Sequence, residues 1–553
     1  MPGQPLIRTA RASLPVAGLT VLGACGGGGI PGAATITQDA LSQDLHALAH
    51  DSMQGRLAGT QDVARAADWV AQRFAALGLQ PAGDDGSFFQ PFDMTWFSLG
   101  SDNTLSVRSG PALPVGEGWT PMGISASGTA TGEVAFAGFG IVEPQLGFDD
   151  YQSADVTGKI VLILEREPGV ENAESPFDGV VTSEASRDWR KVRSAQERGA
   201  IGVLFVRDIQ AREDMDNWPA YHAAMWPADR RRVERYVLSA WAQGVTVPVA
   251  QISANLAQGL VQSSGRSLAE LAQAAEGATN GLGVVALPGA RVSLTTSVER
   301  HTTPGRNILA MVEGSDPSLA TDVVIVGAHH DHDGVSDGEI FNGADDDGSG
   351  TVGVMAVAAA YADALARGER PRRSVLFAVW DAEERGLLGA WYHTLHPRFP
   401  LAGTVANLNM DMIGRNEEVP PEGGRRFTGL DPQTAESNAN AINILGYTRS
   451  PDLAAAIEAA NVETQLTLRF RYDNNESNLL RRSDHWPFLQ NGVPGVWFHT
   501  GLHPDYHTPL DDADRINYEK MTKIVHLVHR TSWELANSDV RLGFEGMRSR
   551  ARS

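Results

Sequence analysis

Residues 322–331 read DVVIVGAHHD, and this stretch decides the fold. It opens with a run that is apolar at almost every position, as expected of a parallel strand covered on both faces. Two similar runs follow, SVLFAVW at 374–380 and VANLNM at 405–410, and GTVGVMAVAAAYADAL at 350–365 between them predicts a helix. We therefore expect an α/β fold in which a mixed, mostly parallel sheet is flanked by helices.

Two regions before this stretch show different residue patterns, one helical and one rich in short strands. Between residues 40 and 83, Leu41, Leu45 and Leu48 and then the apolar positions of 64–77 recur at helical spacing, with Gly78 as a stop. Residues 128–288 instead hold short β-rich runs such as GEVAFAGFG and GKIVLIL, separated by Gly, Pro and Asp. The sequence predicts a discontinuous α/β domain at 37–127 and 289–545, with a β-rich insert at 128–288.

Bulk composition narrows the classes of function. The 553 residues exceed a single compact core. Lys+Arg 45 against Asp+Glu 67 gives a net charge of -22, which disfavours a nucleic-acid partner. With one cysteine there is no intrachain disulfide and no thiolate zinc site, so a metal ion would be held by His and carboxylates.

That single cysteine, Cys25, ends a segment typical of an export signal. Arg8 and Arg11 precede a moderately apolar run and then LGAC at 22–25, an order that resembles a bacterial lipoprotein signal. We expect residues 1–25 to be this signal, with acylation at Cys25, and 26–36 to be a flexible tether. The chain would then lie in the cell envelope, on the periplasmic side and anchored by lipid alone; an ordinary secretory signal is the alternative. No other stretch is expected to be long and apolar enough to span a bilayer.

Acidic and histidine residues stand where the predicted strands end. Ligands gather at the carboxyl ends of strands in open α/β sheets. The residues at these ends are His329 and Asp331, then Asp381, Glu383 and Glu384, then Asp411, then Tyr506 and His507, together with the triplet Asp345–Asp347 before a helix. If these ends converge, the carboxylates repel one another unless cations neutralise them. Two divalent ions would do so, and ligands of nitrogen and oxygen favour zinc, with manganese or cobalt as substitutes.

Each piece also has a structural explanation. The Asp triplet is compatible with a solvated turn or a calcium loop, although Val335 occupies the third acidic position of a loop beginning at Asp331. Asp381 and Glu384 have the spacing of a helix capping box. In an extended strand His330 points away from His329, and so would His332 unless the strand ends first.

Five motifs then give a specific resemblance. GAHHDHDG, NGADDDGSGT, DAEERGLLGA, NLNMDMIG and DYHTPLDD resemble, in this order, the motifs of the M28 family of co-catalytic zinc peptidases. The insert, with ADVTGKIVLI, ERGAIGVLF and VPVAQIS, resembles the protease-associated domain found in many members. The resemblance implies peptide substrates and a zinc-peptidase fold. It covers nearly all of the chain after the signal.

The resemblance also implies roles for individual residues. Asp346 would bridge two zinc ions, with His329 and Asp411 completing one site and Glu384 and His507 the other. Asp331 would orient the imidazole of His329, and Glu383 would be the general base. Tyr506 would donate a hydrogen bond to the tetrahedral oxyanion, or else have only a packing role. Ser483, Asp484 and His485 would line the substrate pocket, or else form a hydrogen-bond network within a loop.

Three activities remain open within this chemistry. An aminopeptidase holds a substrate ammonium with carboxylates, and we favour this reading. A carboxypeptidase holds a carboxylate with arginines, and four of them precede the pocket stretch: Arg469, Arg471, Arg481 and Arg482. A cyclase-type acyl transfer would not need the insert. A receptor-like protein without catalysis is the alternative outside enzymes, and the oligomeric state is not predicted.

Overall fold

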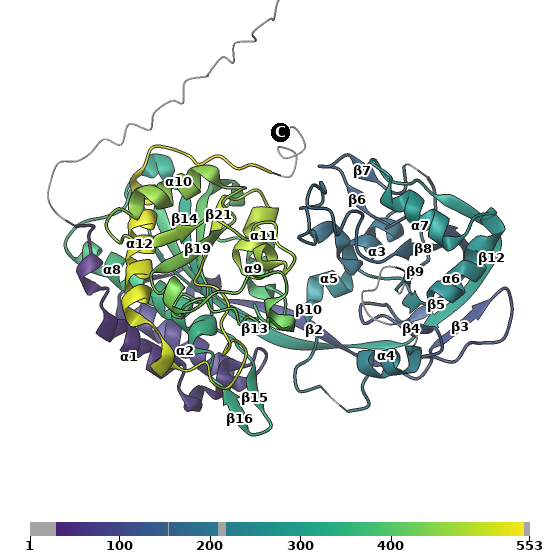
Figure 1. Ribbon diagram of the computed structural model, residues 1–553, viewed down its shortest axis with the longest axis horizontal. Coiled ribbons are helices and arrows are strands. Elements are labelled where there is room, and N and C mark those ends of the chain that lie inside the picture. Colours follow the sequence, from purple (N-terminus) through teal and green to yellow (C-terminus); the bar gives the residue numbers. More distant parts are fainter. Residues whose placement is uncertain (1–28, 153, 208, 210–216, 230, 547–553) are drawn as a thin grey trace, which may run out of the picture.

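The computed structural model describes residues 29–546 apart from 153, 208, 210–216 and 230, and it forms two lobes side by side (Figure 1). Each lobe is built on its own sheet. The larger sheet has ten strands and the smaller one has seven. The predicted signal and Cys25 lie outside the described residues.

Four parallel strands form the centre of the larger sheet. Their order is β17 (Ser374–Trp380), β14 (Val323–His329), β18 (Thr404–Met410) and β21 (Gly495–His499). Antiparallel β13 (Val298–Val312) and β2 (Phe89–Leu99) extend one side, with β10 (Val237–Leu238) at the edge and β1 (Gln80–Pro81) on β13. On the other side lie β19 (Ala441–Leu445) and β20 (Thr467–Arg469). The prediction of a mixed, mostly parallel sheet is confirmed.

Helices cover both faces of this sheet because its central strands are apolar on both sides. Val324 and Val326 of β14 face one core, whereas Val323 and Ile325 face the other. The first core is closed by α1 (Gln38–Leu48), α2 (Gln61–Ala76), α8 (Gly350–Ala366), α10 (Pro451–Ala460) and α12 (Tyr518–Asn537). The second is closed by α9 (Leu388–Leu395) and α11 (His485–Gln490).

The expectation that no stretch after the signal is long and apolar enough to span a bilayer is wrong. Residues Ala344–Ala366, which are α8 and the turn before it, meet both conditions, but 67% of the apolar window is buried inside the protein. Such burial is expected of a helix that packs inside the core of the larger lobe. The helices predicted near the beginning of the chain are also present as α1 and α2, and Gly78 follows α2 with a φ of 70°.

The smaller sheet belongs mainly to the predicted insert. Its order is β3 (Thr104–Val107), β12 (Val285–Thr296), β5 (Gly128–Phe136), β8 (Ile160–Leu164), β9 (Gly202–Val206), β11 (Val249–Ile252) and β4 (Trp119–Pro121). Strands β5, β8, β9 and β11 are parallel. Around them lie α3 (Asp188–Gln196), α4 (Trp218–Met225), α5 (Ser239–Gln243), α6 (Ala254–Val261) and α7 (Leu268–Glu276). Two hairpins, β6–β7 (Val142–Glu143, Phe148–Asp149) and β15–β16 (Gly334–Ser336, Glu339–Phe341), lie outside both sheets.

Strand pairing differs from the predicted boundaries at three places. Strands β3 and β4 precede residue 128 but pair within the smaller sheet, and β12 extends it to Thr296, beyond residue 288. Conversely, β10 lies inside 128–288 but pairs with β2 of the larger sheet. Short strands carry little sequence information about which sheet they join, since pairing depends on partners far along the chain.

The stretch 30–36, predicted as part of a flexible tether, packs on the larger lobe. Ile36 is 3% exposed, and the Nε2 of His529 lies 2.8 Å from the carbonyl oxygen of Pro31. Gly32 has a φ of 79°, and any Cβ there would overlap the carbonyl of Ala360 in α8. The backbone therefore approaches α8 closely, and this stretch is an ordered part of the body.

Candidate metal centre

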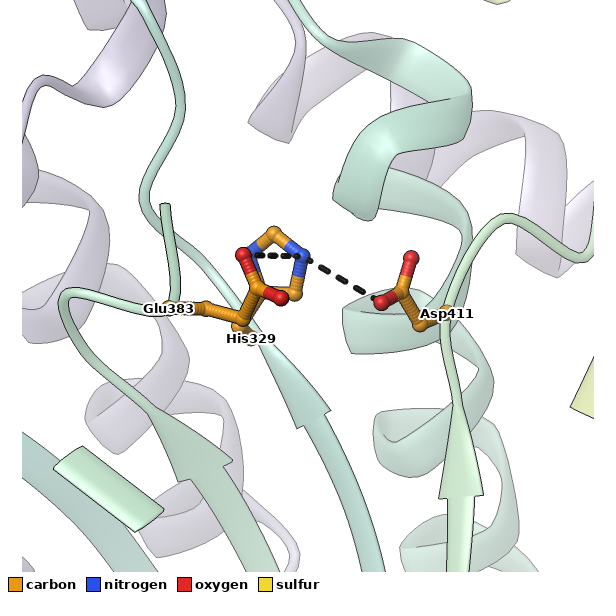
Figure 2. Close-up of side chains that lie close together, drawn as sticks. All are labelled: His329, Glu383 and Asp411. Atoms are coloured by element: carbon orange, nitrogen blue, oxygen red, sulfur yellow. Dashed lines mark ion pairs between the residues drawn. The ribbon is translucent and has the colours of Figure 1, made fainter. Parts of the chain in front are cut away.

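Three strand ends bring a histidine and two carboxylates together (Figure 2). His329 ends β14, Glu383 follows β17 and Asp411 follows β18. The Nε2 of His329 lies 3.8 Å from Glu383 Oε2 and 3.8 Å from Asp411 Oδ2. All three residues are buried. The parallel register of the three strands is what places these side chains at one edge of the sheet.

Asp346 lies between two imidazoles and presents a different oxygen to each. Its Oδ1 is 3.4 Å from His329 Nε2, and its Oδ2 is 3.0 Å from His507 Nε2. Asp346 belongs to the turn Ala344–Ser349 that precedes α8, and its own backbone is non-helical. Asp511 holds this turn, because its carboxylate accepts from the amides of Asp345 and Asp346. A carboxylate in this position is suited to bridge two cations.

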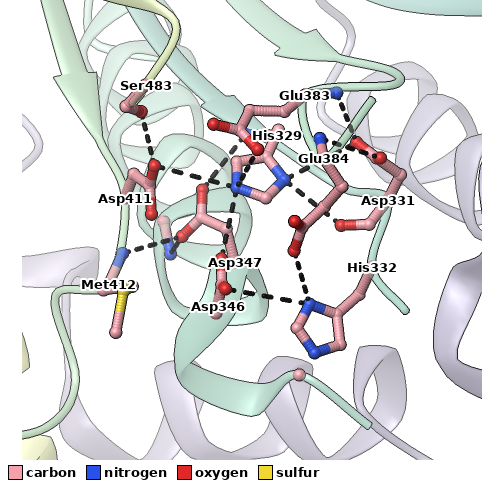
Figure 3. Close-up of polar contacts among 12 residues, drawn as sticks. His329, Asp331, His332, Asp346, Asp347, Glu383, Glu384, Asp411, Met412 and Ser483 are labelled. Atoms are coloured by element: carbon pink, nitrogen blue, oxygen red, sulfur yellow. Dashed lines mark hydrogen bonds and ion pairs between the residues drawn. The ribbon is translucent and has the colours of Figure 1, made fainter. Parts of the chain in front are cut away.

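A second group surrounds His507. Its Nε2 lies 3.4 Å from Glu384 Oε1, and its Nδ1 lies 2.7 Å from Asp333 Oδ2. The imidazole of His332 also enters this group, with Nδ1 3.0 Å from Glu384 Oε1 (Figure 3). Sequence reasoning missed Asp333 and did not settle His332. Strand β14 ends at His329, so the alternation of sides stops there and His332 can turn toward Asp346.

His330 is separate from this cluster, as the alternation within a strand predicts. Its Nδ1 lies 2.7 Å from the carbonyl oxygen of Trp380, and burial lowers the pKa of His330 to about 4. Among the described residues, the groups able to hold an ion are His329–Glu383–Asp411, His332–Asp346–Glu384 and Asp333–Glu384–His507.

Asp331 fixes the turn that carries the two glutamates. Its carboxylate accepts hydrogen bonds from the amide of Glu383 at 2.9 Å and from that of Glu384 at 3.3 Å. The same carboxylate is 3.6 Å from His329 Nδ1, while the backbone oxygen of Asp331 is closer to this nitrogen, at 3.2 Å. Asp331 thus joins the end of β14 to the turn after β17.

The stretch 483–485 contacts the cluster from α11 and the residues before it. Ser483 Oγ donates to Asp411 Oδ2 and accepts from Asn409 Nδ2 at 2.7 Å. Asp484 is fully buried, and within the described residues neither of its oxygens has a hydrogen-bond partner. His485 instead packs against Trp497, with ring centroids 5.6 Å apart. Of the three, Ser483 and Asp484 adjoin the cluster, while His485 belongs to the core behind it.

Tyr506 packs edge-on against His507, with ring centroids 4.1 Å apart. Its backbone oxygen accepts a hydrogen bond from the exposed Arg426 at 2.6 Å. Burial raises the pKa of Tyr506, and the charges of Asp346 and Glu384 act in the same direction. The phenol therefore keeps its proton at neutral pH, as a hydrogen-bond donor must.

The carboxylates of the cluster repel one another. Burial raises the pKa of Glu383 well above its ordinary value, and Glu384, Asp411 and Asp484 raise it further. Burial likewise raises the pKa of Asp411 to about 7, with Asp346 adding to the effect. Although burial alone would lower the pKa of His329 and of His507, neighbouring carboxylates reverse this and raise both. The cluster carries more negative charge than its histidines can neutralise.

The donor set fits divalent cations. The Nε2 atoms of His329 and His507 are both buried and lack a hydrogen-bond partner of acceptable geometry within the described residues. Each points at carboxylate oxygens 3.0–3.8 Å away, a separation that an ion with ligand distances near 2 Å would span. A parallel-sheet α/β domain with this His and carboxylate centre at its strand ends is the architecture of a candidate metallohydrolase.

A family model matches the sequence of this lobe. Residues 307–532 match peptidase family M28. The match begins in β13, covers β14, β17, β18 and β21, and ends within α12.

Curated relatives are similar over parts of the chain. A probable glutamate carboxypeptidase of Zea mays is 26% identical over 85% of this chain and 62% of its own length. A probable glutamate carboxypeptidase of Arabidopsis thaliana is 30% identical over 41% and 30%. A probable zinc metalloprotease of Pyrenophora tritici-repentis is 29% identical over 35% and 48%. The chain thus spans about a third to three fifths of the length of these relatives.

A solved structure, an aminopeptidase from Aneurinibacillus sp. strain AM-1, aligns over 93% of this chain and 96% of that one, with 17% identity and a TM-score of 0.48.

Proposed function

We propose that the chain is a zinc-dependent exopeptidase with two ions per chain, and that it acts as an aminopeptidase. The observation that carries the proposal is the position of Asp346, whose two oxygens face His329 and His507 separately. His329, Asp346 and Asp411 would hold one ion, and Asp346, Glu384 and His507 the other. Manganese or cobalt would suit the same ligands.

Glu383 is the proposed general base. When bound, the ions would lower the pKa of a shared water and polarise the carbonyl of the substrate. Glu383 lies beside His329 and is anchored at its backbone by Asp331, so its carboxylate is directed into the centre. It accepts the proton of the attacking water and returns it to the departing amine. Tyr506, which keeps its proton, would donate a hydrogen bond to the oxyanion.

The charge around Asp484 supports the aminopeptidase reading. This buried carboxylate has no hydrogen-bond partner within the described residues and lies near enough to Asp411 and Asp331 for their charges to raise its pKa. A substrate ammonium would neutralise part of this surplus of negative charge. The test compares hydrolysis of an amino-terminal anilide with that of an N-blocked dipeptide. We expect cleavage of the anilide; cleavage of the blocked dipeptide alone would refute the assignment.

Carboxypeptidase activity is the second candidate, and Arg482 is the residue that favours it. Arg469 contacts Asn438, Arg471 pairs with Glu417 and Arg481 pairs with Glu184. Arg482 is exposed and close enough to Tyr506 to act on the pKa of its phenol. A substrate carboxylate would be within the reach of this guanidinium. If Arg482→Gln raises KM for blocked dipeptides and leaves KM for the anilide unchanged, the result would support carboxypeptidase activity with Arg482 as the residue that binds the substrate carboxylate.

Two further parts of the proposal concern location and the insert. We propose export with a lipid anchor at Cys25, tested by comparing membrane association of the full chain with that of Cys25→Ala.

We also propose that the insert, as a protease-associated domain, covers the metal centre and restricts substrates to short or flexible ends. Arg232 supports this, since its guanidinium reaches from the insert to the backbone oxygens of Asp333 and Val335.

A further inference from the structure

The insert touches the larger lobe beside the candidate metal centre. Its segment 178–187, here called the clamp segment, follows β8 and precedes α3. The amide of Val180 donates to Asn474 Oδ1 and the amide of Thr182 to Asn478 Oδ1, each at 3.0 Å. Asp178 pairs with the buried Arg449. Asn474 and Asn478 shortly precede the stretch 483–485 in sequence. The guanidinium of Arg449 lies 5.3 Å from the ring centroid of Trp486, the residue after this stretch.

Glu184 is the centre of the clamp segment. This carboxylate is 4% exposed, and its Oε1 accepts from the indole Nε1 of Trp486 at 2.9 Å and from Arg481 Nη2 at 3.2 Å. Arg187 completes its shell through Nε at 2.9 Å. Burial alone would raise the pKa of Glu184, but Arg187 and Arg481 outweigh it and the pKa is lowered, so the group is ionised at neutral pH. A buried ionised group with three fixed donors resists displacement.

The clamp segment is itself held by the insert. Ser183 donates through its amide to Glu167 Oε1 at 2.8 Å and through its hydroxyl to Glu167 Oε2. Glu167 is fully buried, three residues after the end of β8, and the neighbouring Arg166 accepts from Lys191 of α3 through its backbone oxygen. The position of Glu184 is therefore fixed relative to the sheet of the insert, because its neighbour Ser183 is bonded to Glu167.

On the other side, the residues that Glu184 holds flank Ser483. Arg481 and Trp486 stand two residues before it and three residues after it, and Trp486 is fully buried in α11. Ser483 Oγ donates to Asp411 Oδ2, and Asp411 is one of the two carboxylates drawn beside His329 in Figure 2. A continuous path of hydrogen bonds and short chain segments thus runs from the insert to a proposed zinc ligand.

We propose that Glu184 is a positioning residue of the metal centre: by holding Arg481 and Trp486 it fixes Ser483, and Ser483 fixes the carboxylate of Asp411. The inference rests on the proposed function, because it assigns Asp411 to an ion. It makes the insert a structural part of the centre in addition to any role as a roof. Partners that orient metal ligands typically change metal affinity or activity by about 10- to 100-fold when removed.

The test is a double-mutant cycle on zinc affinity, measured by competition with a chromophoric chelator on the full chain. Glu184→Gln keeps the size of the side chain but removes its charge, and Ser483→Ala removes the hydroxyl that contacts Asp411. We expect each to weaken the affinity of one zinc site by about 10-fold. The double variant should be no weaker than Ser483→Ala, because both changes break one path. Losses that add, or an unchanged affinity in Glu184→Gln, would overturn the proposal.

Two further variants keep the test decisive if Glu184→Gln folds poorly. Trp486→Phe keeps an aromatic ring in the core but removes the N–H that donates to Glu184, together with part of the indole, so it should weaken the same zinc site. Glu197→Gln is the matched control, because Glu197 is an exposed glutamate of the same insert with a 3.4 Å ion pair to Arg193. It should bind zinc as the unaltered chain does. Equal zinc affinity in Trp486→Phe and the unaltered chain would contradict the proposed path.

A separate readout distinguishes failure of this inference from failure of the proposed function. In the metal-free protein, Glu184→Gln should speed hydrogen exchange in residues 479–490, whereas Ser483→Ala should not, because the helix and its clamp stay intact. If Asp411→Asn binds zinc normally, the assignment of the centre is wrong. If Asp411→Asn loses zinc but Glu184→Gln changes neither affinity nor exchange, only the clamp is wrong.

Discussion

The two lobes carry polar side chains at the same place, the carboxyl ends of parallel strands, and balance their charges differently. In the insert, Glu165 follows β8 and pairs with Arg207 after β9 at 3.1 Å. Gln251 of β11 donates to the same glutamate at 2.5 Å, and Tyr221 donates to Gln251 at 2.6 Å. Each of these four side chains has a hydrogen-bond partner within the network, although the Nε of Arg207 has none among the described residues.

At the strand ends of the larger lobe, carboxylates outnumber the positively charged partners that the chain supplies. Glu383, Asp411 and Asp346 surround one imidazole, that of His329. Asp484 is buried beside them without a hydrogen bond within the described residues. A polar residue at a strand end is therefore a weak indicator of function, whereas a surplus of one sign of charge at that place indicates a ligand of the opposite sign.

Removal of metal gives the largest expected difference between the lobes. Chelation with dipicolinate should abolish peptidase activity and lower the melting temperature, since an ion at a thousandfold excess over its Kd contributes about 4 kcal/mol per site to apparent stability. Hydrogen exchange should accelerate at the ends of β14, β17 and β18 and remain unchanged at β8, β9 and β11. Equal acceleration in both sheets would show that the ions do not reside at the strand ends of the larger lobe.

Glu383→Gln should have the next largest effect. Loss of the proposed general base should lower kcat by about 10²- to 10⁴-fold, with the zinc content measured by mass spectrometry unchanged. Glu165→Gln is the matched substitution in the insert, where the carboxylate meets Arg207 and Gln251. It should lower the melting temperature and leave kcat within about threefold, as expected of a structural network. A comparable loss of kcat in both variants would contradict the contrast between the lobes.

The central strands and the cluster could be predicted from the sequence, because both follow from local patterns. The apolar runs DVVIVGA at 322–328 and SVLFAVW at 374–380 predict buried strands, and the ends of β14 and β17 lie within one residue of these runs. The carboxylates and histidines follow the runs directly, so the parallel arrangement alone brings His329, Glu383 and Asp411 together. Asp346 was placed by motif resemblance, since nothing in its spacing shows that its two oxygens would face two imidazoles.

Other features depend on contacts between distant segments. His332 joins the second group because β14 ends at His329, a boundary that the sequence does not specify. Asp333 orients His507 across 174 residues, and Glu184 reaches Trp486 across 302. Residues 30–36 were predicted to be part of a tether from their composition alone. They pack on the larger lobe because Gly32 can approach α8 closely, a contact that composition does not reveal.

The pH dependence of stability should also separate the lobes. Burial raises the pKa of Asp411 to about 7, well above the ordinary value near 4. A raised pKa means that the folded state binds the proton more tightly than the unfolded chain, so stability falls as pH rises from about 4 to about 7. The metal-free protein should therefore melt at a lower temperature at pH 8 than at pH 5.5.

Zinc should reverse this dependence, because metal ligands must be deprotonated and binding strengthens as pH rises. Burial also raises the pKa of Glu165 and Glu167 in the insert to about 7, and these groups contribute equally with and without metal. The difference between melting curves with and without zinc, recorded across pH 5.5–8, thus isolates the larger lobe. A difference that does not change with pH would contradict the proposed ligands.

The smallest expected effect comes from Asp333, where the larger lobe most resembles the insert. Its carboxylate contacts His507 Nδ1 at 2.7 Å and Arg385 Nη2 at 3.1 Å, so it has partners within the chain. Asp333→Asn keeps a hydrogen-bond acceptor for the imidazole and removes only the charge, so zinc affinity should fall by about 10-fold and kcat by less. Asp337→Asn, an exposed change in the nearby hairpin turn, should leave both unchanged. If Asp333→Asn lowers kcat as much as Glu383→Gln does, Asp333 itself binds an ion, as its place in the group Asp333–Glu384–His507 allows.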